Sequence, residues 1–156
     1  MPIYMRITKN GVPVITGDVT AQGHENWIEI SSFSFGIQRD LPRDVEPKEK
    51  PRAQEVIVTK ANDSASTKLM HASLGLAPYD GSLQVQFDFV KGTNIVYYKV
   101  FLSDALISRW SISSGGDRPS ETVTFNFMKL AYDFDVSPRD EDWWKLPAPQ
   151  PPSKPR

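Results

Sequence analysis

The chain has 156 residues, of which 39% are hydrophobic, and this is enough for one domain with a sizeable core. A formal net charge of -1, from 18 basic and 19 acidic residues, provides no long-range field that would gather nucleic acid or anionic lipid. The absence of cysteine excludes disulfides, thiolate metal ligands and cysteine nucleophiles. We therefore expect a single domain without a nucleic-acid partner.

The sequence also lacks the apolar segments that direct proteins into or across membranes. No apolar run reaches the roughly 18 residues of a membrane-spanning helix. The first residues do not combine a charged segment, an apolar run and a small-residue cleavage site. We expect a soluble protein with no membrane span and no general secretory signal.

The N-terminal part of the chain reads as strands separated by turns. Residues 3–8 predict a short strand, and Gly11 and Gly17 punctuate a hairpin around residues 12–15. Residues 27–39 then predict one long, bent strand.

Two segments change the face on which their apolar side chains lie. In residues 28–37 the apolar side chains stand at the even positions 28 and 30 and then at the odd positions 33, 35 and 37. In residues 122–134 they stand at odd positions up to Phe127 and at even positions from Met128. Because side chains in a strand alternate with a period of two, each change requires a bulge or a passage between packed layers. We expect a mainly β fold, a small barrel of antiparallel strands.

Residues 40–52 interrupt the strand pattern. They contain three prolines, four acids, four bases and only two sizeable apolar residues. This composition is too broken by proline for a helix and too charged for a core strand. We expect an exposed, extended loop.

The next segment predicts a strand at residues 53–60 and then the only convincing helix. Asn62 and Asp63 are residue types that cap helix N-termini, and Gly75 stands where a helix C-terminus prefers glycine. Between them, apolar residues recur with helical spacing at Ala65, Leu69 and Ala72, with Met70 and Leu74 beside them.

The following segments predict amphipathic and two-sided strands. Residues 83–89 alternate apolar and polar side chains, and residues 91–94 form a turn. Residues 95–102 are β-branched, aromatic or aliphatic on both faces, so neither face reads as simply facing water. Residues 113–119 form a hairpin turn to the next strand. The two-sided strand needs cover that a neighbouring subunit can provide.

The last nineteen residues hold six of the thirteen prolines. Such a segment favours polyproline II or disorder and is not expected to join the sheet. We therefore divide the chain into a barrel domain, residues 1–137, and a proline-rich tail, residues 138–156. Two adjacent tryptophans in the tail are candidates for docking on the domain's own surface or on a partner, namely Trp143 and Trp144.

Residue types that could carry catalysis are present but form no catalytic pattern. His24 lies in a polar turn and His71 in the predicted helix, and no Gly-x-Ser-x-Gly elbow presents a nucleophile. Residues 115–116 join two strands, so no helix dipole is aimed at an anion there. The aspartates at 133 and 135 share a strand face but lack the convergent partners of calcium or glycosidase sites. We assign no catalytic, cofactor-binding or metal-binding residue.

Several segments, taken in order, resemble the Hcp family, the tube protein of type VI secretion. They are residues 28–37 (Ile-Glu-Ile-Ser-Ser-Phe-Ser-Phe-Gly-Ile), the passage from Thr59 to Leu69, residues 97–108 and residues 113–127. The likeness covers about residues 3–134 and depends on the combination, because no one segment is decisive.

The resemblance implies a small β-barrel with one lateral α-helix, six copies of which form a ring. Rings would stack into a tube within a sheath, assemble in the bacterial cytoplasm, and be expelled without a signal peptide, together with spike and effector proteins. It implies a structural protein, not an enzyme, with no cofactor. Subunit or ring contacts would then involve the charged loop, through Arg43, Asp44, Glu46, Lys48, Lys50 and Arg52.

Two departures and three alternatives stand beside this interpretation. The family's loop is often glycine-rich, whereas residues 40–52 are rich in proline and charge, and the tail lies outside the family pattern. A phage tail tube protein, a monomeric ligand-binding β-barrel, and an esterase or glycosidase on a β scaffold are the alternatives. Gene neighbourhood distinguishes a phage tail tube protein from a secretion tube protein, and oligomeric mass distinguishes a monomeric barrel from a tube protein.

Overall fold

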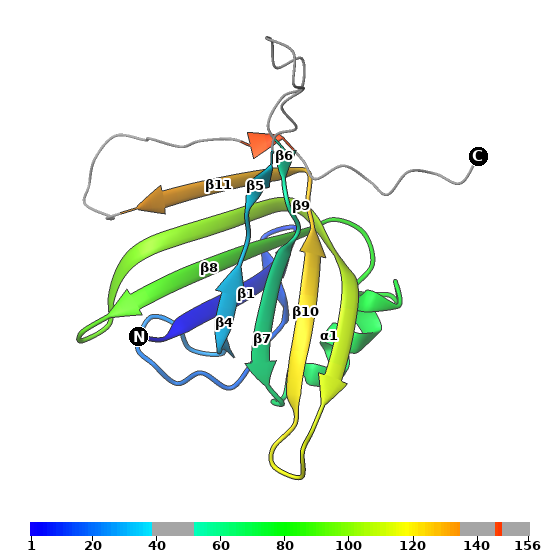
Figure 1. Cartoon of the computed structure of the whole chain (residues 1–156), viewed down its shortest axis with the longest axis horizontal. Helices are drawn as coiled ribbons and strands as arrows, with labels where there is room; N and C mark the ends of the chain where they lie inside the picture. The colour runs from blue at the N-terminus through cyan, green and yellow to red at the C-terminus, as the bar shows by residue number, and fades with distance from the viewer. Residues whose placement is uncertain (39–51, 135–145, 148–156) are drawn as a thin grey trace.

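The computed structural model describes residues 1–38, 52–134 and 146–147, which form antiparallel strands with one helix at their side (Figure 1). The expected mainly β class is confirmed. No helix in these residues is long and apolar enough to cross a membrane. The elements are β1 (Ile3–Lys9), β2 (Val12–Ile15), β3 (Ile28–Ile30), β4 (Ser32–Ser34), β5 (Ile37–Gln38), β6 (Arg52–Ala53), β7 (Val56–Ala61), α1 (Ser66–Ser73), β8 (Leu83–Lys91), β9 (Ile95–Ser113), β10 (Ser120–Asn126), β11 (Lys129–Phe134) and β12 (Leu146–Pro147).

Strand pairing runs around the molecule in the order β2, β1, β8, β9, β10, β7 and β4. β3 pairs with β1 and β4 pairs with β7, so these two short strands join both ends of the curved sheet. Between them, the Ser31 N–H donates to the Thr59 carbonyl oxygen at 2.7 Å. The sheet is therefore barrel-like. The ladder of hydrogen bonds between its strands is interrupted at Ser31, so the barrel is not closed.

The long strand expected at residues 27–39 is three short strands instead. Ile28 and Ile30 of β3 are buried and Phe33 of β4 packs against the core, so the change of face is confirmed. Ile37 does not share that inner face, because β5 pairs with β6 in a separate two-stranded sheet. Its side chain is 54% exposed.

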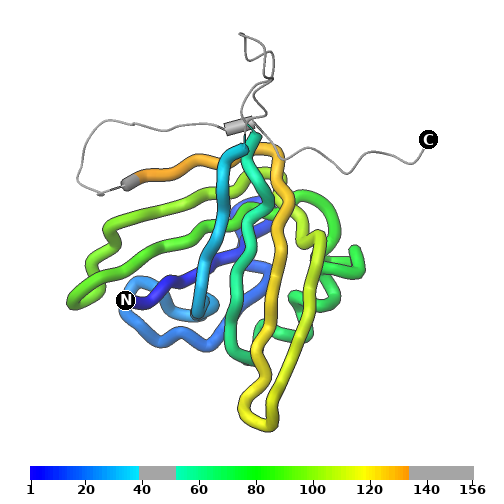
Figure 2. Tube along the Cα trace, in the orientation of Figure 1, coloured from blue at the N-terminus to red at the C-terminus, as the bar shows by residue number. Residues whose placement is uncertain are grey.

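β9 belongs to both halves of the curved sheet. Its first half pairs with β8 and β11, its second half pairs with β10, and Figure 2 shows the bend between them. Val100 and Leu102 of the first half are buried, whereas Tyr97, Lys99 and Phe101 on the other face are half-buried. This confirms that neither face of residues 95–102 simply faces water.

The second change of face occurs between β10 and β11. Phe125 and Phe127 are buried before it and Leu130 is buried after it. β10 pairs with the second half of β9 and β11 pairs with the first half, so the chain passes from one half of the sheet to the other. The expected inward position of Met128 is wrong, because this residue lies in the connection and is 61% exposed.

The core fills the space between the two halves of the sheet. Phe87 stands at its centre, with ring centroids of Phe33 at 4.9 Å and Phe125 at 6.1 Å. Burial of each such side chain contributes about 1.5–3 kcal/mol to folding. α1 packs on β9, and its Leu69 side chain is fully buried.

The two ends of α1 are stabilised in different ways. Gly75 has a φ of 72° directly after the C-cap residue, as the sequence predicts. At the start, the N-cap residue is Ala65, which provides no side-chain cap. The Asp63 Oδ1 atom instead accepts the Ala65 N–H at 2.9 Å, so the aspartate caps the turn that leads into the helix. Leu74, expected beside the apolar stripe, is 65% exposed.

The expectation that the tail does not join the sheet is wrong at Leu146–Pro147, which form one short strand. In β12, Leu146 is paired with Leu130 and Pro147 with Lys129. Among the described residues β12 pairs only with β11, and an edge position tolerates proline because its missing N–H breaks no second ladder. The proposed boundary between residues 137 and 138 lies outside the described residues.

Candidate functional site

Most of the predicted contact residues lie outside the described residues. This applies to Trp143 and Trp144 and, in the charged loop, to Arg43, Asp44, Glu46, Lys48 and Lys50. Arg52 is described and lies half-buried in β6, where it pairs with Gln38 of β5. Subunit contacts through the charged loop therefore stay a prediction.

His24 lies among turn hydrogen bonds, as the sequence predicts, but its side chain is buried. Its Nε2 atom lies 2.8 Å from Asp88 Oδ2, and its ring contacts Tyr4 and Trp27 at centroid distances of 4.9 and 4.7 Å. Asp88, which alternation predicts to face solvent, is 4% exposed and also accepts a hydrogen bond from Gln86 Nε2 at 2.9 Å. The pair connects the segment before β3 to β8, which is a structural role.

A second buried polar cluster lies beneath the start of α1. Lys60 and Glu121 are both fully buried, and Lys60 Nζ lies 3.0 Å from Glu121 Oε2 and 2.8 Å from Asp63 Oδ1. Glu121 also accepts hydrogen bonds from Trp110 Nε1, at 3.0 Å, and from the Ser66 hydroxyl. The cluster joins β7, β9, β10 and α1 with its buried charges paired.

Sequence reasoning missed this cluster, although a signal for it was present. Lys60 has the same parity as the inward-facing Val56 and Val58 in β7. Glu121 likewise has the parity of the inward-facing Val123 in β10. A charged residue at the inner parity of each of two neighbouring strands predicts a buried ion pair.

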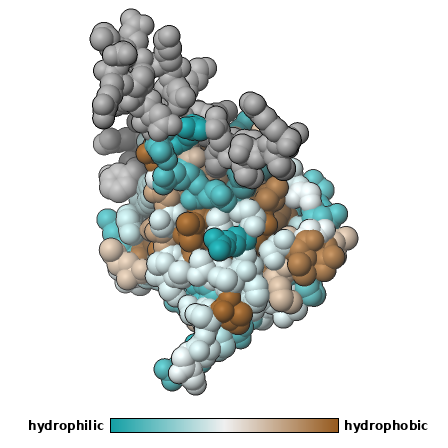
Figure 3. Space-filling view, turned by 45° about the vertical axis from the view of Figure 1, so that its right-hand side comes forward, coloured by the Kyte–Doolittle hydropathy of each residue, from teal (hydrophilic) through white to brown (hydrophobic). Residues whose placement is uncertain are grey.

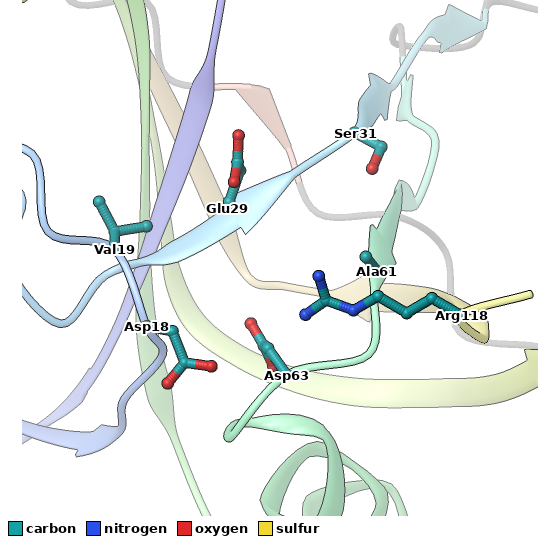
Figure 4. A pocket seen from close by; sticks show the side chains of 7 residues that line it. All are labelled: Asp18, Val19, Glu29, Ser31, Ala61, Asp63 and Arg118. Carbon is teal, nitrogen blue, oxygen red and sulfur yellow. The ribbon is translucent and has the colours of Figure 1, made fainter.

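Polar side chains surround a cavity of about 210 Å³ beside this cluster (Figure 4). Asp18 accepts hydrogen bonds from the Ser64 hydroxyl at 2.5 Å and from its N–H at 3.1 Å, and these lower the pKa of its carboxyl. Arg118 Nε donates to the Asn62 carbonyl oxygen at 2.8 Å. No group of three His, Cys, Asp or Glu suited to a metal ion occurs in the part of the chain that the structure describes. The cavity is thus bordered by groups that tie the start of α1 to the neighbouring loops.

A row of four hydroxyl groups crosses the sheet on the face opposite the core. The residues of this hydroxyl row lie opposite one another in the pairing of β4, β7, β10 and β9. The next set of paired residues along the same strands has side chains toward the core: Phe33, Val58, Val123 and Trp110. The hydroxyl row itself consists of Ser32, Thr59, Thr122 and Ser111.

The hydroxyl row provides hydrogen-bonding groups without charge. Ser32 Oγ and Thr59 Oγ1 are 2.5 Å apart, and all four side chains are half-buried or exposed. Each hydroxyl both donates and accepts, so the row can contact polypeptides of varied sequence. Figure 3 shows one side of the molecule, on which separate apolar spots lie among residues of hydrophilic and intermediate hydropathy.

An apolar groove of about 550 Å³ lies where α1 ends. Leu74 and Leu106 line it with Tyr79, and these two leucines are 65% and 52% exposed. Exposed apolar side chains that gather at a groove are typical of contact surfaces.

The comparison with protein families gives one match. The model of the family described as "Type VI secretion system effector, Hcp" matches residues 4–134. No curated protein sequence matches this chain significantly.

Solved structures of Hcp proteins share the fold. A variant of Hcp1 from Escherichia coli EAEC 042 is 18% identical, with a TM-score of 0.77 over 94% of this chain and 99% of the other. The secreted protein Hcp3 from Pseudomonas aeruginosa is 21% identical, with a TM-score of 0.70 over 93% and 98%. A type VI secretion system effector from Yersinia pestis is 21% identical, with a TM-score of 0.67 over 91% and 96%.

Proposed function

This chain belongs to the Hcp family of type VI secretion system effectors, since the family model matches residues 4–134, and from this membership we propose that it is a structural subunit of the secretion tube. Six copies form a closed ring, and rings stack into a tube within a sheath. The tube assembles in the bacterial cytoplasm and is expelled with spike and effector proteins, without a signal peptide. The subunit performs no catalysis.

The family match over most of the chain carries this proposal, and two structural features support it. Ile95, at the start of β9, is an apolar side chain that is 56% exposed, as expected of a surface that contacts a neighbour. The exposed leucines of the groove beside α1 provide a second such surface. A ring forms when two different surfaces of one subunit meet and the rotation closes.

In the proposed ring the hydroxyl row faces the lumen. A lumen that holds effectors of varied sequence is best lined by uncharged groups, because fixed charges would repel some cargo and retain other cargo. Thr59, Thr122 and Ser111 meet this requirement on three adjacent strands.

The oligomeric mass tests the ring. Sedimentation equilibrium at micromolar concentration should give about six times the chain mass of 17.6 kDa, and negative-stain images should show closed rings. A monomer that persists at all concentrations would contradict the proposal and favour the ligand-binding barrel. Neighbouring genes for a sheath and an ATPase, and not for a capsid and portal, distinguish a secretion tube from a phage tail.

Gold labelling tests the position of the hydroxyl row within the ring. Because the chain contains no cysteine, the Ser111→Cys variant accepts maleimide-linked gold at one site. The label should lie at the ring centre in electron micrographs, whereas the matched label on Thr67→Cys, an exposed residue of α1, should lie away from the centre. Gold from Ser111→Cys at the outer rim would exclude a lumen position.

A further inference from the structure

The apolar groove beside α1 carries negative charge as well as exposed leucines. Asp80 and Asp104 line it together with Leu74 and Leu106, and none of the described residues that line it is basic. Lys9 Nζ lies 3.6 Å from Asp80 Oδ1, so the charge of Asp80 is partly balanced. Asp104 is exposed, and its carboxylate has no hydrogen bond or ion pair within the part of the chain that the structure describes. The groove therefore presents apolar side chains beside one uncompensated carboxylate.

Asp104 stands at a β-bulge. The register between β8 and β9 shifts at Gln84, where Ser103 and Asp104 of β9 stand opposite one residue of β8. Asp104 has a φ of 51°, in the left-handed region that aspartate and asparagine tolerate better than most residues with a side chain. Glycine satisfies such a backbone more readily, but it would leave the groove without this charge.

The turn between β8 and β9 presents the complementary combination of groups. Lys91 is paired with Ile95, and Lys91 Nζ lies 5.6 Å from the ring centroid of Tyr97, so these three side chains share one face. Ile95 is 56% exposed, and no carboxylate pairs with Lys91 among the described residues. We call Lys91, Ile95 and Tyr97 the hairpin surface. It is apolar, with one uncompensated positive charge.

The hairpin surface and the groove both involve β9 but lie far apart on it. Ile95 and Asp104 are nine residues apart, which corresponds to about 30 Å of extended strand. Figure 1 shows the turn between β8 and β9 at the left of the molecule and α1 at the right. The two surfaces therefore cannot meet within one chain, but they can meet between copies arranged head to tail.

We propose that the hairpin surface of one copy docks in the apolar groove of the next, where Lys91 pairs with Asp104. Ile95 then contacts Leu74 and Leu106, so opposite charges and exposed apolar groups are matched across the contact. A second copy fits because a contact between two different surfaces, repeated around a ring, leaves neither surface free on any subunit. This inference rests on the proposed ring and names two surfaces that meet in it.

Cross-linking of the full chain tests the contact. Because the chain contains no cysteine, the double variant Ile95→Cys/Leu106→Cys reacts with a short bismaleimide at these two positions. We expect a ladder of covalent species, from two chains to six, on denaturing gels. The matched control is Ile95→Cys/Ile112→Cys, in which the second cysteine replaces an exposed apolar residue of β9 outside the groove. It should give no ladder.

Neutral substitutions test the charge pair. Asparagine tolerates a left-handed φ, so Asp104→Asn removes the charge without straining the bulge. Asp104→Asn and Lys91→Gln should each raise the concentration at which half of the chains are in rings by about threefold, as measured by sedimentation velocity. The double variant should raise it no further, because either substitution alone already breaks the pair. The matched variant Asp117→Asn, in the exposed turn between β9 and β10, should leave this concentration unchanged.

Two results would overturn this inference while the proposed ring stands. One is a parent chain that forms rings although Ile95→Cys/Leu106→Cys gives no more cross-linking than its control. The other is full additivity of Lys91→Gln and Asp104→Asn, which would show that the two charges do not interact. A parent chain that stays monomeric at all concentrations would instead contradict the proposed function, and this inference with it.

Discussion

Replacing Glu121 by glutamine tests whether the buried cluster holds α1 on the sheet. The fully buried carboxylate accepts hydrogen bonds from Lys60 Nζ and Trp110 Nε1, both at 3.0 Å, and from the Ser66 hydroxyl. Glutamine preserves the volume of the side chain but places a neutral amide beside a fully buried ammonium group. The variant therefore removes one of the two carboxylates that pair with Lys60 while leaving the packing in place.

The expected loss of stability is large. Removing one partner of a buried ion pair costs about 3–5 kcal/mol, because the remaining charge is left uncompensated. Lys60 retains Asp63 at 2.8 Å, so we expect a loss of about 3 kcal/mol, the lower end of that range. For a domain of this size each kcal/mol lowers Tm by about 2–4 °C, which gives a decrease of about 6–12 °C.

Urea unfolding followed by far-UV circular dichroism measures this change. All variants are compared at one chain concentration, because assembly stabilises the folded state by mass action. The control is Glu55→Gln, the same chemical change at an exposed residue that accepts a hydrogen bond from Ser108 at 2.6 Å. Its effect should stay below about 1 kcal/mol.

A double substitution provides the decisive test. If the ion pair acts as a unit, Lys60→Met combined with Glu121→Leu should destabilise the protein less than the sum of the two single changes. A loss below about 1 kcal/mol for Glu121→Gln, or strict additivity in the double variant, would refute the reasoning.

Three further predictions concern other parts of the fold. Replacing His24 by alanine leaves its buried carboxylate partner without this donor and opens a cavity, so the free energy of unfolding should fall by about 2–4 kcal/mol in urea titrations; a negligible loss would contradict the structure. The Ser64 hydrogen bonds lower the pKa of Asp18 from 3.8, so the stability that this carboxylate contributes is present above about pH 4 and is lost as pH falls through the folded-state pKa. The difference in Tm between the parent chain and Asp18→Asn should therefore shrink between pH 5 and pH 2. A difference that stays constant over this range would exclude the linkage. A Cβ atom at Gly17 would lie 2.6 Å from a backbone carbonyl oxygen, so Gly17→Ala should lower Tm clearly, whereas Gly115→Ala, with no atom within 4 Å of its Cβ, should leave Tm unchanged; equal Tm values would contradict the described packing.

Much of the fold follows from patterns that are local in the sequence. Phe127 and Leu130 are both buried although they are three residues apart, whereas buried side chains on one face of a strand lie an even number of residues apart. This spacing indicates that the chain passes between the two halves of the sheet. The end of α1 is recorded in Gly75, because its positive φ disfavours other residues. The apolar and polar residues of a strand or helix alternate with a period of only a few residues, so such elements can be predicted without knowing which segments they pack against.

The polar contacts between distant segments were decided by tertiary structure. His24 and Asp88 are 64 residues apart, and Lys60 and Glu121 are 61 apart, so no local pattern pairs them. The strand at Leu146–Pro147 likewise exists because β11 offers an edge to pair with, against the local tendency of a proline-rich segment. Local spacing specifies which side chains turn inward, but the energy of a buried charge or of an edge strand depends on groups that only the folded chain brings together.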